Sequence, residues 1–190
     1  MNKAIVVLII SDVFLLTGFG LVQPILSIYI KENLVGGTVL AAGIAVMLFM
    51  LTKSIVQLPL SKIVDKRKQS FRIKLMVAGT FMISLVPFLY IFSNHVFYIY
   101  LAQIIYGLGN GLAYPSWIGV WTRNSAVKNN SFDWSVYSTA TGIGTAIAAL
   151  IGATIAEFFG YVYTFMLVGI LALFACFVLL GIECKTCKKT

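Results

Sequence analysis

Six long apolar stretches, separated by short polar segments, run along this chain. An α-helix needs about 20 mainly apolar residues to cross the hydrocarbon core of a bilayer, and each stretch reaches roughly that length. The stretches lie at roughly 4–30, 35–60, 73–93, 96–121, 135–159 and 161–182. The pattern therefore predicts an all-α, polytopic membrane protein with a single transmembrane domain of six helices.

The composition indicates that lipid surrounds most of these side chains. Of the 190 residues, 60% are hydrophobic and 11% are charged. Soluble domains are usually about half apolar, so this chain has more apolar surface than a soluble core could bury. We therefore expect an integral protein of the cell membrane, with the lipid bilayer as its first partner.

The basic residues are distributed unevenly between the two predicted sides of the membrane. The net charge is +8, from 14 Lys and Arg against 6 Asp and Glu. Lys31 lies on one side, and the other side holds Lys3, Lys62, Lys66, Arg67, Lys68, Arg72, Lys74, Arg123, Lys128, Lys185, Lys188 and Lys189. Cytoplasmic loops of membrane proteins carry an excess of Lys and Arg. Both termini are therefore predicted to be cytoplasmic, and the positive charge requires no nucleic-acid partner.

The sequence has no set of residues typical of an enzyme, a metal site or a cofactor site. It contains no Gly-rich phosphate loop, no nucleophile motif and no paired His–Glu motif, and its one histidine is His95. Cys184 and Cys187 form a single C-x-x-C pair, whereas a structural zinc site normally has four ligands. We therefore expect no catalytic residue, no metal and no cofactor.

A motif of seven residues occurs twice. Gly18–Pro24 and Gly109–Pro115 both read G-x-G-L-x-x-P, at an offset of 91 residues. A weaker echo pairs Ile63–Asp65 with Ile155–Glu157, at an offset of 92 residues. Three predicted helices separate the two copies, so the copies cross the membrane in opposite directions. This arrangement is typical of the inverted repeats of secondary transporters.

The duplication predicts how the domain is divided. Repeat one covers about 1–93, repeat two covers about 94–183, and a cytoplasmic tail covers 184–190. Glycine and proline at matching places mark positions where a helix bends or approaches a neighbour. These candidate bend residues are Gly18, Gly20, Pro24, Gly109, Gly111 and Pro115. The alternative is that both copies are ordinary Gly/Pro kinks of membrane helices.

Two charged residues, Asp12 and Lys53, lie inside the predicted spans and well away from their ends. A carboxylate near the centre of a spanning helix costs about 2.5–3.5 kcal/mol, so Asp12 should face a cavity or a partner. Burial favours the neutral form of a carboxyl group, which suits a proton-coupled carrier. A structural contact between helices is the other interpretation. Lys53 lies at a similar depth on the next helix, where it either pairs with Asp12 or snorkels to the cytoplasmic surface.

Polar and aromatic residues extend this pattern along three predicted helices. Helical spacing puts Phe19 and Gln23 on the same face as Asp12, and puts Gln57 one turn from Lys53. On the fourth helix, Gln103, Asn110 and Trp117 recur every seven residues, and Tyr114 lies on the next turn after Asn110. The predicted substrate and proton pathway therefore consists of Asp12, Phe19, Gln23, Lys53, Gln57, Gln103, Asn110, Tyr114 and Trp117. The alternative is that the amides form hydrogen bonds between helices.

The segment Ser61–Lys68 resembles a signature of the major facilitator superfamily. That signature has a small residue, then Asp after three further positions, then basic residues, between the second and third helices. Ser61, Asp65, Lys66 and Arg67 match it, with Ser61 where the family usually has Gly. The drug–proton antiporters of the family have a Gly-rich segment with a Pro in helix five, whereas helix five of this chain has glycines but no Pro. The resemblance implies a cytoplasmic gating loop formed by these four residues.

The resemblance also implies an architecture and a function. Members have two six-helix bundles and work by alternating access, and this chain resembles the amino-terminal bundle. We therefore expect a secondary active transporter of a small solute, acting as a homodimer or with a second six-helix half, and proton-coupled through Asp12. Family analogy favours efflux. The alternative is a non-transporting half that serves as an assembly partner or is a degenerate fragment.

Overall fold

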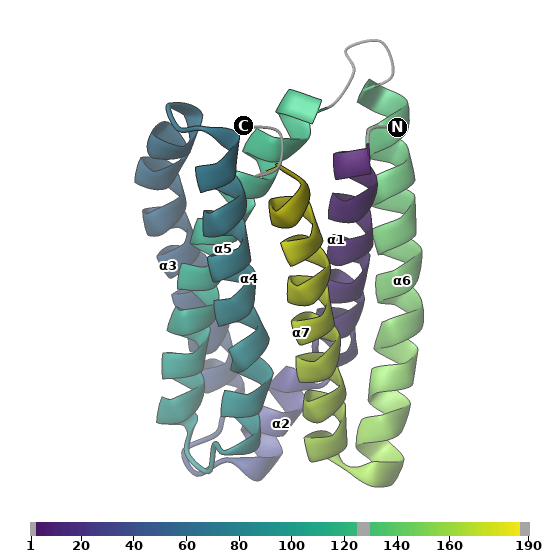
Figure 1. Cartoon of the computed structure of the whole chain (residues 1–190). Helices are drawn as coiled ribbons and strands as arrows, with labels where there is room; N and C mark the ends of the chain where they lie inside the picture. Colours follow the sequence, from purple (N-terminus) through teal and green to yellow (C-terminus); the bar gives the residue numbers. More distant parts are fainter. Residues whose placement is uncertain (1–2, 125–129, 187–190) are drawn as a thin grey trace.

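The computed structural model describes residues 3–124 and 130–186, and within these ranges the chain is helical (Figure 1). The helices are α1 (Lys3–Val22), α2 (Leu26–Asn33), α3 (Val39–Asp65), α4 (Gln69–Ile91), α5 (Val96–Asn124), α6 (Asn130–Phe159) and α7 (Tyr161–Thr186). A helix satisfies its own backbone hydrogen bonds, which is what a chain in lipid requires.

Six segments in the described part of the chain are long and apolar enough to cross a membrane. They are Ile5–Asn33, Val39–Asp65, Gln69–Ile91, Val96–Asn124, Ser131–Phe159 and Tyr161–Gly181. The helices are longer than the apolar stretches predicted them to be, mainly at their polar ends. Ser61–Asp65 and Gln69–Arg72 were expected in a connecting loop, but they extend α3 and α4. A helix can continue past the apolar core because its polar end is solvated.

The first span is interrupted at Pro24. The helix stops at Val22 and resumes at Leu26, and the amide of Ile25 donates to the carbonyl of Val22 at 3.0 Å. Proline has no N–H to donate and its ring clashes with the preceding turn. The matching Pro115 lies inside the continuous α5. The two copies of the repeated motif therefore differ in backbone conformation, because the helix is interrupted at Pro24 and continues through Pro115.

The first helix of each half of the chain packs mainly against the two later helices of the other half. Helix α1 packs against α6 and α7, whereas α5 packs against α3 and α4, and α4 also packs against α7. Helices α3 and α6 are the most exposed, with 17% of their apolar segments buried against 44–50% for the other spans. Figure 1 shows them at the flanks of the bundle.

The motif glycines lie where another helix approaches closely. A Cβ on Gly20 would meet Thr145 of α6 at 3.0 Å, and one on Gly111 would meet Val56 of α3 at 2.8 Å. A Cβ on Gly109 would lie 2.9 Å from the carbonyl oxygen of Gly79 in α4. Small residues at such crossings let helix backbones come together in lipid, where packing drives association.

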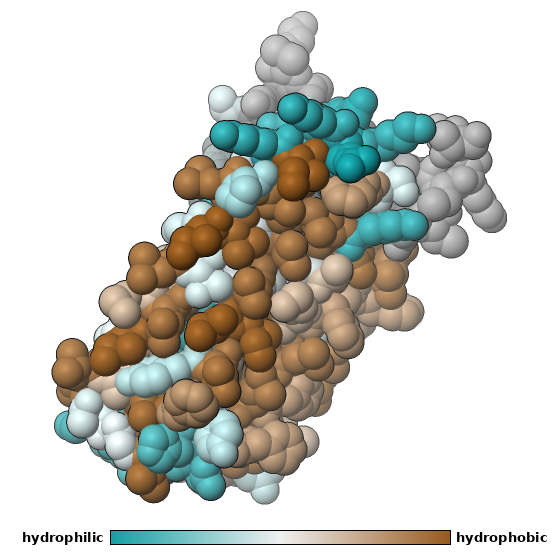
Figure 2. Space-filling model, turned by 90° about the vertical axis from the view of Figure 1, so that its left-hand side faces the viewer, coloured by the Kyte–Doolittle hydropathy of each residue, from teal (hydrophilic) through white to brown (hydrophobic). Residues whose placement is uncertain are grey.

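Hydrophilic groups gather at the ends of the molecule. Figure 2 shows an apolar band between two polar ends, with the larger hydrophilic group at the upper end. In Figure 1 that end carries the α3–α4 connection, the start of α1 and the end of α7. The predicted tail 184–190 is helical as far as Thr186, and 187–190 lies outside the described residues.

Candidate functional site

A cavity of about 190 Å³ is lined by residues of α1, α3, α4, α5, α6 and α7. Its lining is mostly apolar, with a few polar groups among them. The residues are Asp12, Leu15, Leu16, Lys53, Met76, Thr80, Ile83, Asn110, Ala113, Tyr114, Trp117, Tyr137 and Leu179. A concave apolar site with a small number of polar groups is the usual form of a small-molecule site.

Asp12 of α1 is held by Tyr137 of α6. The phenolic O–H of Tyr137 donates to Oδ2 of Asp12 at 3.0 Å, and both residues line the cavity. This hydrogen bond joins two helices and partly replaces the water that the carboxyl group has lost. It leaves the other carboxyl oxygen available to a proton or a solute.

Lys53 of α3 also faces the cavity. Its Nζ lies 4.9 Å from the centre of the Tyr114 ring, within the range of a cation–π contact. Among the described residues, Lys53 and Asp12 form no ion pair within 4.0 Å, although they share the cavity. The ammonium group of Lys53 therefore contacts an aromatic ring in the cavity that it shares with Asp12.

Asn110 and Trp117 of α5 complete the polar lining. Asn110 donates to the carbonyl of Tyr106 on its own helix at 3.1 Å. The indole N–H of Trp117 is buried and has no hydrogen-bond partner in the described part of the chain. Trp117 is 6% exposed, so this donor faces neither bulk water nor lipid. A buried donor without a partner costs free energy, which a hydrogen bond to an acceptor would recover.

Trp117 also belongs to an aromatic cluster between α5 and α6. Its ring stacks on Trp121 at 5.0 Å, and Trp134 and Tyr137 pack edge-on or tilted against both. A second cavity of about 570 Å³ lies along this cluster and shares Trp117 with the first. The two cavities are therefore adjacent.

The other predicted pathway residues lie outside the lining. Phe19 stacks on Tyr106 at 4.7 Å, and Tyr106 stacks on Phe49 at 4.4 Å, so three rings bridge α1, α5 and α3. Gln23 is exposed at the first position after α1, and its amide still donates to the carbonyl of Phe19 at 3.1 Å. Gln103 is 3% exposed, and Gln57 is half-buried. The role of these four side chains in a pathway stays a prediction.

The predicted gating loop is tied to the bundle by Arg72, at the start of α4. Its guanidinium donates to the carbonyls of Val64 and Asp65 at 3.0 Å each, and to that of Gly119 in α5 at 2.7 Å. The end of α3 is thereby linked to α5. Ser61 donates to Leu58 within α3, and the side chains of Asp65, Lys66 and Arg67 are exposed.

Sequence reasoning missed two of these residues. Tyr137 gives no periodic signal, although it is the one tyrosine in the stretch 135–159. Arg72 was counted as a basic residue of the loop, whereas it is 8% exposed and bonded to three carbonyls. The sequence gives only a weak signal of this burial, which is that Arg72 stands at the edge of the apolar run that contains Met76.

Comparison with known proteins decides the family. The Major Facilitator Superfamily matches residues 8–184 of this chain. The chain belongs to the Major Facilitator Superfamily. This family consists of transporters and generally not of enzymes, and its members are integral membrane proteins. The match agrees with the six candidate spans and with the resemblance of Ser61–Lys68.

Curated relatives within the superfamily are distant. An uncharacterised MFS-type transporter of Methanocaldococcus jannaschii is 25% identical over 176 residues, which cover 92% of this chain and 44% of that protein. A proton-coupled antiporter flippase of Staphylococcus saprophyticus, LtaA, is 26% identical over 135 residues, covering 71% of this chain and 34% of that protein. The chain therefore spans less than half the length of these relatives.

A solved structure shows the same arrangement of helices. The crystal structure of the POT family transporter PepTSo aligns with a TM-score of 0.73 at 15% identity. The alignment covers 94% of this chain and 37% of that transporter. At this identity the likeness shows the fold alone: the six spans correspond to part of a Major Facilitator fold.

Proposed function

We propose that this chain is one six-helix bundle of a secondary active transporter. It moves a small solute by alternating access, together with a second bundle that is another copy of the chain or a separate half. A proton carried on Asp12 drives the transport, and the direction is export. Membership of the Major Facilitator Superfamily supports the assignment as a transporter. The cavity, the packing of the helices and the distribution of charge support the more specific parts of the proposal.

The cavity carries this proposal. Asp12 and Lys53 bring a carboxyl group and an ammonium group to one cavity from two helices, without pairing. Ionisable residues inside a membrane are costly to bury and usually mark a substrate or proton path. A solute with an acceptor group would bind Lys53 and the N–H of Trp117, and protonation of Asp12 would change the charge beside it.

The exchange of helix partners supports two inverted three-helix repeats. If spans one to three correspond to spans four to six, then α1 corresponds to α5. Gly20 of α1 contacts α6 and Gly111 of α5 contacts α3, which are themselves corresponding spans. Gly18 contacts α7 and Gly109 contacts α4 in the same way. Repeats of this kind are common in secondary transporters.

The distribution of charge supports cytoplasmic termini. The α3–α4 connection, which contains Lys66 and Arg67, lies at the end of the bundle where α1 begins and α7 ends (Figure 1). The opposite end holds Lys31. The positive-inside rule places the basic end in the cytoplasm. The proton coupling is supported by the LtaA relative, whose name describes a proton-coupled antiporter, whereas the outward direction rests on family analogy alone.

Proton coupling is tested in proteoliposomes that contain the chain and a trapped pH-sensitive dye. Candidate solutes are added in turn, and a transported solute changes the internal pH. We expect Asp12→Asn to abolish this proton flux while keeping exchange of the solute across the membrane. Glu157→Gln, an exposed carboxylate of α6 outside the cavity, should behave as wild type. Unchanged proton flux in Asp12→Asn would refute the coupling role.

The need for a second bundle is tested by native mass spectrometry of the chain released from lipid nanodiscs. A dominant dimer supports transport by two copies. A monomer that moves no solute contradicts self-sufficient transport and supports the alternative, a half that assembles with another protein. The exposed flanks α3 and α6 are the surfaces that a second bundle would cover.

A further inference from the structure

Two shallow grooves lie beside the connection between α3 and α4, away from the central cavity. Their volumes are about 430 and 480 Å³, and both are lined by Lys66 and Arg67. The smaller groove adds Lys62 and Ile63, and the larger one adds Lys68, Ser70, Phe71 and Lys74. Sites for small molecules commonly measure about 300–1,000 Å³, so each groove is large enough for a headgroup.

The grooves are strongly basic. The segment from Ser61 to Lys74 contains six basic residues and one acidic residue, Asp65. Arg72 is used by its three carbonyl partners, but the side chains of Lys66, Arg67 and Lys68 are exposed. Cations this close together repel one another, and a bound anion relieves that repulsion.

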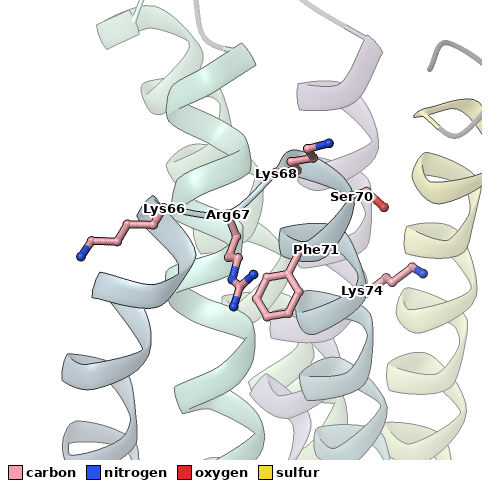
Figure 3. Close-up of a pocket in the computed structure, with 6 residues that line it drawn as sticks. All are labelled: Lys66, Arg67, Lys68, Ser70, Phe71 and Lys74. Carbon is pink, nitrogen blue, oxygen red and sulfur yellow. The ribbon is translucent and has the colours of Figure 1, made fainter.

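Apolar surface lies directly beside these charges. The Arg67 guanidinium lies 5.5 Å from the centre of the Phe71 ring, which is 39% exposed. Figure 3 shows Arg67 reaching down beside Phe71, while Lys66 and Lys68 extend away from it on either side. Ile63 is 45% exposed in the neighbouring groove. A ligand in these grooves would therefore contact cationic side chains and, directly beside them, exposed apolar side chains.

The grooves lie at the depth of lipid headgroups. They lie where the candidate span Val39–Asp65 ends and the candidate span Gln69–Ile91 begins. Below them the surface of this face is the apolar band of Figure 2, which acyl chains would cover. The order of cations, aromatic ring and apolar band follows the order of phosphate, glycerol and acyl chain in a phospholipid.

We propose that these grooves bind the phosphodiester headgroup of an anionic phospholipid. Arg67 holds the phosphate with its two-pronged guanidinium, Lys66 and Lys68 supply further positive charge, and Phe71 and Ile63 contact the upper acyl chain. Basic pockets between spanning helices are known to recognise anionic headgroups. A soluble phosphate would gain nothing from Phe71 and Ile63, so the membrane lipid is the ligand.

The test counts lipids on the intact chain. The protein is reconstituted into bilayers of equal phosphatidylglycerol and phosphatidylcholine, extracted gently, and analysed by native mass spectrometry. We expect wild type to retain phosphatidylglycerol in preference to phosphatidylcholine. Arg67→Gln should lower that preference about fivefold, the effect of one basic residue near a membrane surface. Lys66→Gln, which affects both grooves, should act in the same direction.

Arg123→Gln is the matched control, because Arg123 is an exposed arginine that lines neither groove. It should leave the preference unchanged, and circular dichroism checks that each variant keeps its helix content. The proposal is overturned if wild type retains both lipids equally, or if Arg67→Gln keeps the wild-type preference. It is also overturned if Arg123→Gln lowers the preference for phosphatidylglycerol as much as Arg67→Gln does, since positive charge anywhere on the surface would then account for the binding. Selective displacement of the lipid by inorganic phosphate, compared with chloride at equal ionic strength, would show a free-phosphate site instead.

Discussion

Replacing Gly79 by alanine should destabilise the bundle, because α4 and α5 touch backbone to backbone at this point. A Cβ at position 79 would lie 2.6 Å from the carbonyl oxygen of Gly109 and 2.7 Å from the amide nitrogen of Ala113. Ordinary contacts of this kind measure 3.4–4 Å. Both partners are backbone atoms, so no side chain can rotate away and the two helices must separate.

The magnitude follows from comparing Gly79→Ala with Gly43→Ala. Alanine in place of glycine gains about 1 kcal/mol of helix propensity at either position. A Cβ on Gly43 would meet nothing within 4 Å, so Gly43→Ala keeps the whole gain. Overpacking costs about 1–3 kcal/mol, and this cost falls on Gly79→Ala alone. The propensity gain cancels in the difference, so the two variants should differ by about 1–3 kcal/mol in unfolding free energy.

The assay is reversible unfolding in mixed micelles with increasing sodium dodecyl sulfate, followed by tryptophan fluorescence. The three tryptophans are Trp117, Trp121 and Trp134, which cluster between α5 and α6 and report on that packing. Equal stability of the two alanine variants would refute the close approach of α4 and α5. A more stable Gly79→Ala variant would refute it more strongly.

Two further predictions concern hydrogen bonds that connect helices. Arg72→Lys should lower the free energy of unfolding by about 2 kcal/mol or more, because one ammonium group cannot reach three carbonyls. Arg123→Lys is the control. The amide of Arg67, which donates to the same carbonyl of Val64, should exchange its hydrogen faster in Arg72→Lys. Tyr137→Phe should cost about 0.6 kcal/mol, the average for a hydrogen bond between membrane helices, whereas Tyr163→Phe on the exposed face of α7 should cost nothing measurable. A neutral Arg72→Lys, or a Tyr137→Phe no different from Tyr163→Phe, would contradict the corresponding contact.

The spans could be predicted from the sequence because their signal is local. A run of about 20 apolar residues needs no knowledge of the rest of the fold. The break at Pro24 was not predictable in the same way. The chain has four prolines, and Pro59, Pro87 and Pro115 lie inside continuous helices. A proline leaves a backbone group unpaired wherever it falls, and tertiary contacts decide whether the helix continues.

The site was predictable in part for a similar reason. Depth along a helix can be counted, so Asp12 and Lys53 were expected at one level, and both line the cavity. Tyr137, which donates to Asp12, lies 125 residues along the chain from it. No spacing rule connects two residues so far apart. Gln23 is the residue directly after the last residue of α1, and its place in a pathway stays a prediction.

Arg72 recognises the main chain, and this has a consequence for how the sequence can change during evolution. Its partners are the carbonyl oxygens of Val64, Asp65 and Gly119, which every amino acid possesses. The residue at position 65, whose side chain is exposed, can therefore change without loss of the link, whereas Val64 is 1% exposed and stays constrained by its packing. Position 119 is constrained through Arg72, because a Cβ there would lie 3.1 Å from Nη1 of Arg72 and the guanidinium would have to shift by a few tenths of an ångström. We therefore expect positions 72 and 119 to change together among close homologues, although the contact joins the side chain of one residue to the main chain of the other.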